Sequence, residues 1–124
     1  MAHILVIDDE SILLNLISLT LQQDGHTVTA ISDPMSAIDS AVDGKPPVDL
    51  LLTDVNMRPI GGPELVRRLN QAGCNPPVLF MSGDPALSNL MAGTSCQHAV
   101  IDKPFTTGEL RFAVARILGL SQQG

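Results

Sequence analysis

Short apolar runs and helical segments alternate along this whole chain, and that alternation restricts the fold more than any other feature. Runs of strand length cover residues 3–7, 27–31, 48–53, 77–81 and 98–101. The segments between them carry apolar residues at helical spacing and are too long to be hairpin turns. Such a repeat demands parallel strands joined by right-handed crossovers. We therefore predict an α/β domain with a doubly wound five-stranded parallel sheet and helices on both faces.

Helix boundaries are also readable from the sequence. A helix is predicted over residues 11–23, because apolar residues recur there at helical spacing: Ile12, Leu13, Leu16, Ile17 and Leu21. Asp33 before Pro34 is a predicted N-cap, and Thr106 with Glu109 forms a predicted capping box. A short helix is expected over residues 84–93. Gly119 is expected to end the last helix.

Size and charge restrict the function classes. A chain of 124 residues makes one domain, here residues 1–120, with residues 121–124 as a polar tail or the start of a linker. A net charge of −6 argues against nucleic acid as a direct ligand. Neither a signal peptide nor a membrane-spanning stretch is recognisable. We expect a cytoplasmic domain, without membrane contact, whose Cys74 and Cys96 are free thiols.

Four of the apolar runs end on polar side chains of one chemical set. Asp8 and Asp9 follow the first run, and Asp54 follows the third. Ser82 ends the fourth run, and Lys103 comes shortly after the fifth. In open parallel sheets, ligands bind at the carboxyl ends of the strands. The polar strand ends therefore predict a functional site at that edge.

The residue types at this edge suit a cation and a phosphoryl group. Three carboxylates close together repel one another unless a cation intervenes, and Mg²⁺ prefers oxygen ligands of this kind. Lys103 can neutralise Asp54 or a phosphoryl oxygen, and Ser82 can donate a hydrogen bond to one. Taken singly, each of these residues has an ordinary explanation as a helix cap, a turn or an exposed side chain. Their joint occurrence at four strand ends favours a site.

The same residues resemble the receiver domain of bacterial two-component response regulators, over residues 3–118. The motifs that carry the resemblance are Ile-Asp-Asp-Glu after the first strand, Asp54-Val-Asn-Met with Gly62 and Glu64-Leu65 after the third, Ser82-Gly83 after the fourth, and Lys103-Pro104-Phe105. The resemblance implies the chemotaxis-regulator-like, flavodoxin-like (βα)5 fold. It also implies a cis peptide bond before Pro104.

The resemblance assigns a role to each site residue. Asp54 would be the phosphoacceptor, with Ser82 and Lys103 as the hydroxyl and lysine that contact the phosphoryl group. Asp8, Asp9, Asp54 and the Asn56 carbonyl would hold Mg²⁺, with Mn²⁺ as the alternative cation. The phosphoryl donor would be a sensor histidine kinase or a histidine phosphotransfer protein. The implied domain is no turnover enzyme, although it assists its own phosphorylation and dephosphorylation.

Two departures from the family pattern concern the route from this chemistry to an output. Val100 stands where the family usually has an aromatic residue, three residues before the lysine. The fourth helix looks short, which implies an altered response surface. Arg58 stands where the family often has proline and is expected only to reshape its loop. The output partner is left open, as is the choice between a monomer and a phosphorylation-dependent dimer.

Two other functions compete with the phosphorylatable receiver. A receiver-like module could signal through binding alone; Val100 favours this weakly, and the complete acidic, hydroxyl and lysine set argues against it. An aspartate-nucleophile phosphatase would usually need two aspartates separated by one residue after the first strand. Asp8 and Asp9 are adjacent, which disfavours that enzyme. The chain could also be a stand-alone protein or a domain of a larger regulator or hybrid kinase.

Overall fold

Five parallel strands form one sheet in the order β2-β1-β3-β4-β5. The computed structural model describes residues 2–44, 47–83 and 98–122. The strands are β1 (His3–Ile7), β2 (Thr27–Ile31), β3 (Leu50–Asp54), β4 (Val78–Ser82) and β5 (His98–Asp102). The helices are α1 (Ser11–Gln23), α2 (Pro34–Asp43), α3 (Gly62–Gln71) and α5 (Thr107–Gln122). The predicted doubly wound parallel sheet is confirmed, and the helix expected over residues 84–93 lies outside the described residues.

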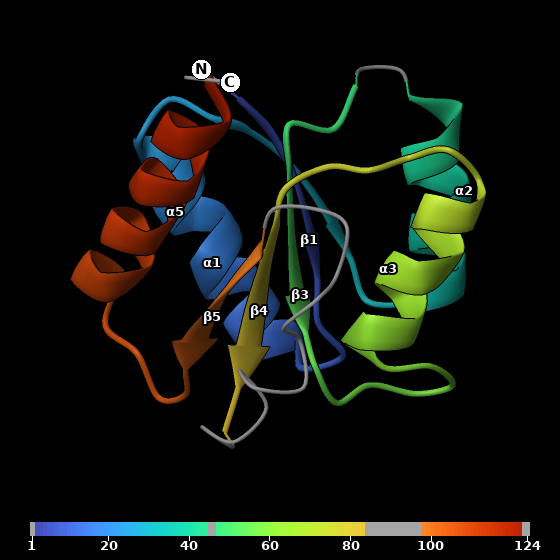
Figure 1. The fold of residues 1–124 in the computed structure, drawn as a ribbon. Helices are drawn as coiled ribbons and strands as arrows, with labels where there is room; N and C mark the ends of the chain where they lie inside the picture. The colour runs from blue at the N-terminus through green and yellow to red at the C-terminus, as the bar shows by residue number, and fades with distance from the viewer. Residues whose placement is uncertain (1, 45–46, 84–97, 123–124) are drawn as a thin grey trace.

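Helices cover both faces of the sheet, and two apolar layers result (Figure 1). Alternate side chains of a strand point to opposite faces, so Ile4 and Val6 of β1 pack with α1 and α5, whereas Leu5 and Ile7 pack with α2 and α3. β1, β3 and β4 are buried along their whole length. Strands buried on both faces read as continuous apolar runs, which is why these strands were recognisable in the sequence.

Side-chain caps begin two of the helices as predicted. The Asp33 carboxylate accepts a hydrogen bond of 3.1 Å from the backbone N–H of Met35. In the capping box, the N–H of Glu109 donates to the Thr106 hydroxyl, and the N–H of Thr106 donates to the Glu109 carboxylate. These bonds satisfy backbone donors that have no partner inside the helix.

The prediction that Gly119 ends the last helix was wrong, because α5 continues to Gln122. A glycine ends a helix when it takes a left-handed conformation. Among the described glycines only Gly25, Gly44 and Gly73 have positive φ angles, and Gly25 and Gly73 follow α1 and α3. Gly119 keeps a right-handed backbone and lets the helix continue.

The helix predicted over residues 11–23 is confirmed as α1, but not all of the apolar residues that predicted it are buried. Leu14, Ile17 and Leu21 pack into the core, but Ile12 is 87% exposed and Leu16 is 48% exposed. Apolar residues on α1 occupy more of the helix circumference than one contact with the sheet can cover. Spacing alone therefore predicted the helix but not which apolar side chains it buries.

No helix in the described ranges is long and apolar enough to cross a membrane.

Candidate functional site

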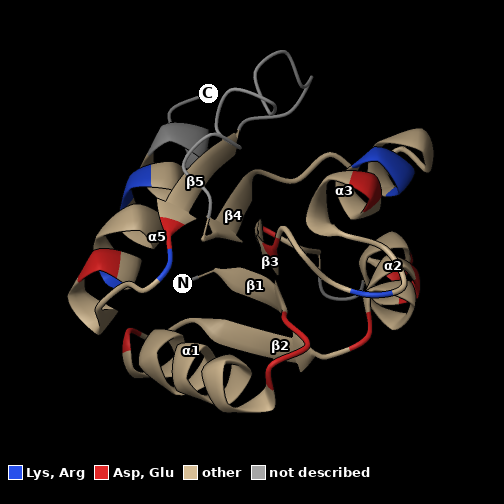
Figure 2. Cartoon of the chain, turned by 90° about the horizontal axis from the view of Figure 1, so that it is seen from below, with Lys and Arg blue, Asp and Glu red and all other residues tan. Residues whose placement is uncertain are grey.

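The strand register brings the polar strand ends together at the carboxyl edge of the sheet. Ile7 of β1 pairs with Thr53 of β3, so the next residues, Asp8 and Asp54, are neighbours. Figure 2, which looks onto this edge, shows acidic positions gathered after β1 and β3. On the other side of β3, β4 ends at Ser82, which pairs with Asp102, the residue before Lys103. The predicted convergence of the four strand ends is confirmed.

Three carboxylates converge here, and one of them was not assigned a role from the sequence. Asp8, Glu10 and Asp54 each offer a carboxylate oxygen within 4.8 Å of the others. Asp8 is fully buried and Asp54 is nearly so, whereas Glu10 is exposed. Glu10 was in the quoted motif, but an exposed glutamate before a helix gave no separate signal. Its place in the cluster follows from the turn between β1 and α1.

Lys103 is the cation of this cluster. Its Nζ lies 3.1 Å from Asp54 Oδ2, 3.6 Å from Asp8 Oδ2 and 3.7 Å from Glu10 Oε1. The lysine side chain is 20% exposed, and its backbone N–H donates a hydrogen bond of 2.7 Å to the Ser82 carbonyl. The end of β4 therefore anchors the residue whose side chain reaches across to β1 and β3.

Burial and charge shift the pKa values of the cluster. Burial is the main cause that raises the pKa of Asp8, helped by Asp54 and Glu10; the hydrogen bond from the Glu10 N–H and the charge of Lys103 oppose this rise. For Lys103, burial opposes the charged form. The hydrogen bond to Asp54 and the charges of the three carboxylates outweigh burial and raise the pKa of the ammonium. Lys103 is thus held as a cation, and Asp8 is a carboxylate whose burial is only partly offset by Lys103 and the Glu10 N–H.

The hydrogen bonds of Asp8 test whether a metal ion fits this edge. Asp8 Oδ1 accepts a hydrogen bond of 2.9 Å from the Glu10 N–H. Asp8 Oδ2 is buried and has no hydrogen-bond partner, which is costly for a polar atom. A divalent cation would satisfy this atom and offset the repulsion among the carboxylates. The donor set therefore fits an oxygen-liganded ion such as Mg²⁺.

Asp9 and Asn56, the other predicted ligands, lie beside the buried cluster. Both line an open hollow of about 430 Å³ whose wall also includes Arg58 and Gly61. The N–H of Asn56 donates a 3.3 Å hydrogen bond to Asp54 Oδ1, which joins the hollow to the cluster. Asp9 is exposed and lies outside the group formed by Asp8, Glu10 and Asp54.

Close packing holds the end of β3 in place. A side chain on Gly62 would put its Cβ 2.5 Å from the Asp54 carbonyl oxygen and 3.3 Å from the Phe80 ring. Only glycine lets the start of α3 approach the strand this closely. Ser82 is fully buried at the end of β4. The peptide bond before Pro104 is cis, as the resemblance implied, and the Arg58–Pro59 bond is also cis.

Val100 occupies the position of the expected aromatic residue. It is half-buried, pairs with Phe80 of β4 and packs against the apolar cluster under α2 and α3. A β-branched valine is short and has restricted rotamers. It cannot make the large swing of an aromatic ring between buried and exposed positions.

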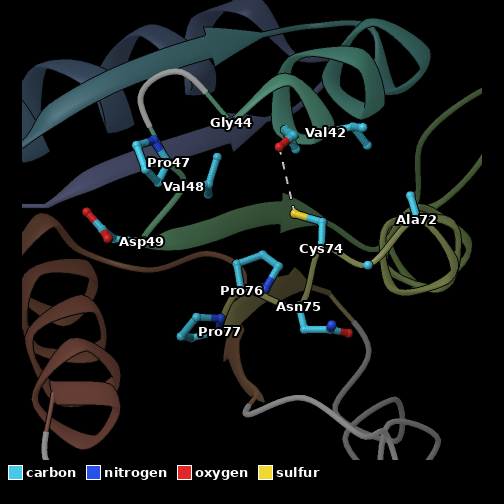
Figure 3. Close-up of a pocket in the computed structure, with 12 residues that line it drawn as sticks. Val42, Gly44, Pro47, Val48, Asp49, Ala72, Cys74, Asn75, Pro76 and Pro77 are labelled. Carbon is cyan, nitrogen blue, oxygen red and sulfur yellow. Dashed lines mark hydrogen bonds between the residues drawn. The ribbon is translucent and has the colours of Figure 1, made fainter.

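Another hollow, of about 570 Å³, lies at the opposite, amino edge of the sheet (Figure 3). The Cys74 thiol points into it and donates a hydrogen bond of 3.8 Å to the Ala41 carbonyl. Burial raises the pKa of this thiol, so the reactive thiolate is disfavoured. Val48, Pro76 and Pro77 add apolar or ring surface to the wall. This hollow takes no part in the site at the carboxyl edge.

Known proteins resemble the chain over almost its whole length. Residues 4–115 match the family described as the response regulator receiver domain. The transcriptional regulatory protein TrcR of Mycobacterium tuberculosis is 32% identical over 119 residues, which is 95% of this chain and 44% of TrcR. The chain spans about half the length of most curated relatives it matches.

Solved structures agree with the sequence matches. A response regulator receiver protein from Sinorhizobium medicae is 33% identical with a TM-score of 0.81, covering 95% of this chain and 94% of that one. A receiver domain protein from Clostridium thermocellum is 26% identical with a TM-score of 0.86, covering 99% and 98%. Fold and sequence thus point to the same family.

Proposed function

Because the chain belongs to the response regulator receiver domain family, we propose that it accepts a phosphoryl group on Asp54 in a two-component phosphorelay. The donor would be a phosphohistidine of a sensor histidine kinase or of a histidine phosphotransfer protein. One observation carries the proposal: a strand-end aspartate lies 3.1 Å from a lysine ammonium, beside a buried carboxylate that lacks a hydrogen-bond partner.

The side chains suit in-line phosphoryl transfer. An Asp54 oxygen forms a bond to phosphorus as the phosphorus–nitrogen bond breaks, and the bonding electrons leave with the histidine ring. Negative charge spreads over the transferred oxygens in the transition state. The Lys103 ammonium and the Ser82 hydroxyl would stabilise that charge. The product is an acyl phosphate on Asp54.

Asp8, Asp9, Asp54 and the Asn56 carbonyl would hold Mg²⁺, or Mn²⁺ in its place, and Glu10 is an additional candidate ligand. The ion would supply positive charge that offsets both the carboxylates and the incoming phosphoryl oxygens. The orphaned Oδ2 of Asp8 supports this assignment, because it is a buried acceptor with no protein donor.

The proposed output is a change of binding partner rather than catalytic turnover. The domain would assist its own phosphorylation and dephosphorylation, and the acyl phosphate would be the signal. Because Val100 cannot swing as an aromatic ring does, the signal would be relayed through the Ser82 and Lys103 contacts and the strand ends they belong to. An attached output domain, as the length of the relatives suggests, belongs to this proposal.

Incubation with acetyl phosphate tests the proposal. With Mg²⁺, intact mass spectrometry should show one phosphoryl group on the parent protein and none on Asp54→Asn. Chelation of the metal and Lys103→Met should each slow the reaction, whereas Asp39→Asn, an exposed aspartate on α2, should react like the parent. A parent protein that gains no phosphoryl group would contradict the proposal.

A receiver-like module that signals without phosphorylation is the second candidate, favoured by Val100. It predicts that adding beryllium fluoride to the Mg²⁺-containing sample shifts no backbone NMR signals of the parent or of Asp54→Asn. The phosphorelay proposal predicts shifts at the strand ends of the parent alone. Continuous release of phosphate from unrelated phosphomonoesters would instead indicate a phosphatase.

A further inference from the structure

Arg58 lies in the loop between β3 and α3, on the wall of the hollow that adjoins the phosphoacceptor. Asp9 and Asn56 line the same hollow, and the Asn56 N–H reaches Asp54 Oδ1 at 3.3 Å. A molecule that occupies this hollow would therefore meet both Arg58 and the surroundings of Asp54.

The charges around the hollow are unbalanced. Four carboxylates, of Asp8, Asp9, Glu10 and Asp54, lie at this edge, and Lys103 forms ion pairs with three of them. The whole chain has a net charge of −6. A phosphoryl donor is itself an anion, so it approaches against this charge. Beside the proposed Mg²⁺, a cation that the protein's own carboxylates do not already hold would favour its approach.

Arg58 is a cation of that kind. Most other described cations are paired: Arg67 and Arg68 with Glu64, and Arg111 with Asp24. Within residues 2–44, 47–83 and 98–122, Arg58 makes no hydrogen bond or ion pair, and its side chain is exposed. A guanidinium presents several donors in one plane, which suits the oxygens of a phosphoryl group.

We infer that Arg58 is a donor-binding residue, which pairs with the anionic phosphoryl donor in the hollow before transfer to Asp54. This inference rests on the proposed function. The ligand class is a phosphoryl group carried on oxygen or nitrogen. With acetyl phosphate, an Asp54 oxygen bonds to phosphorus, the bond from phosphorus to the acetate oxygen breaks, and acetate leaves with the electron pair. Arg58 neither gains nor loses a proton.

Initial phosphorylation rates, measured against donor concentration in the presence of Mg²⁺, test the inference. Arg58→Gln should lower the rate at low donor concentration about two- to fivefold, as expected for one exposed charge pair, and leave the rate at saturation unchanged. Arg58→Lys should keep part of the effect. Arg116→Gln is the matched control, because Arg116 is an exposed arginine on α5 outside this hollow. Near 0.5 M salt the difference should shrink, since exposed charges are then strongly screened.

Two donors separate the sources of the phosphoryl group. Acetyl phosphate carries it on oxygen, and phosphoramidate carries it on nitrogen, as phosphohistidine does. An Arg58→Gln effect with both donors supports recognition of the phosphoryl group itself. Equal rates for Arg58→Gln and Arg116→Gln, or a loss confined to the saturating rate, would overturn the inference while phosphorylation of Asp54 stood.

A binding measurement tests Arg58 without any transfer. In the Asp54→Asn background, acetyl phosphate should shift the backbone NMR signals of residues 55–61, and adding Arg58→Gln should weaken that binding two- to fivefold, the same range as above. Unchanged binding would count against Arg58. Thermal unfolding of each variant checks that the fold is intact.

Discussion

Replacing Asp8 by asparagine should stabilise the metal-free protein, although it removes a partner of Lys103. At an effective dielectric constant of about 20, Lys103 at 3.6 Å attracts Asp8 by about 5 kcal/mol. An oxygen of Asp54 lies within 4.8 Å of an oxygen of Asp8, and at that distance the two carboxylates repel each other by about 3.5 kcal/mol. Glu10 is 66% exposed, so solvent screens its repulsion to about 1 kcal/mol.

These charge effects nearly cancel, so burial decides the outcome. Asp8 is fully buried, and its Oδ2 has no donor; a buried group in that condition costs about 1–3 kcal/mol. Asparagine keeps an oxygen that can accept from the Glu10 N–H, carries no charge, and can turn its amide toward the neighbouring carboxylates. Asp8→Asn should therefore raise the free energy of unfolding by about 1–3 kcal/mol, or the Tm by about 4–12 °C.

The pH dependence of this gain follows from the raised pKa of Asp8. Its protonated form favours the folded state, a contribution present below the ordinary value of 3.8 and lost as pH rises through the higher folded value. The advantage of Asp8→Asn should therefore be larger at neutral pH than at pH values below 3.8.

Thermal unfolding followed by circular dichroism, with a chelator present, measures the effect. Asp39→Asn, an exposed carboxylate on α2, should change stability by less than about 0.5 kcal/mol. Mg²⁺ should then stabilise the parent but much less the Asp8→Asn variant, because the proposed ion site exists only in the folded acidic cluster. If Asp8→Asn melted below the parent in chelator, the description of Asp8 as a buried charge that its partners only partly offset would be refuted.

Three further perturbations test other parts of the structure. Lys103→Met should destabilise the protein by about 2 kcal/mol at neutral pH, as urea unfolding would measure. The pKa of Lys103 is raised in the folded protein, so the loss of stability should persist up to the ordinary lysine pKa of 10.5. It should shrink as pH rises through the higher pKa of the folded state. The pKa of Glu64 is lowered to about 2, mainly by the hydrogen bond from Arg67, so its stabilising effect is present above the ordinary pKa of 4.5 and lost as pH falls toward 2. The unfolding free energies of Glu64→Gln and the parent should therefore become equal near pH 2. A difference that stayed constant with pH would contradict the ion pair. Gly62→Ala should cost about 1–3 kcal/mol in chemical unfolding because its Cβ meets the Asp54 carbonyl oxygen at 2.5 Å, whereas Gly83→Ala, with open space around its Cβ, should be nearly neutral; equal losses would show that the close approach is not the cause.

Much of the fold was predictable because the central strands are buried on both faces. Continuous apolar runs marked β1, β3 and β4, and the lengths of the connections required parallel pairing. Local hydrogen bonds also made the caps at Asp33 and Thr106 readable. The end of α5 could not be predicted locally, because Gly119 can take either a helical or a left-handed backbone. Which of these it adopts depends on the packing of the last turn, beyond any local signal.

The site was predictable as a set of residues at strand ends but not in its details. Parallel register brings Asp8 next to Asp54, and that follows from the order of the strands. The place of Glu10 depends on how the chain turns after β1, and the hollow beside Arg58 depends on the course of the loop before α3. Neither has a periodic pattern. Exposure of Ile12 likewise depends on how much of α1 the sheet covers.

The central claim is that Asp54 itself carries the phosphoryl group. After reaction with acetyl phosphate and Mg²⁺, borohydride reduces an acyl phosphate to an alcohol and releases phosphate, which turns a phosphorylated aspartate into homoserine. Peptide mass spectrometry then locates the modified residue. The account predicts homoserine at position 54 and nowhere else. Homoserine at Asp8 or Asp9, or none in a folded protein that binds Mg²⁺, would contradict it.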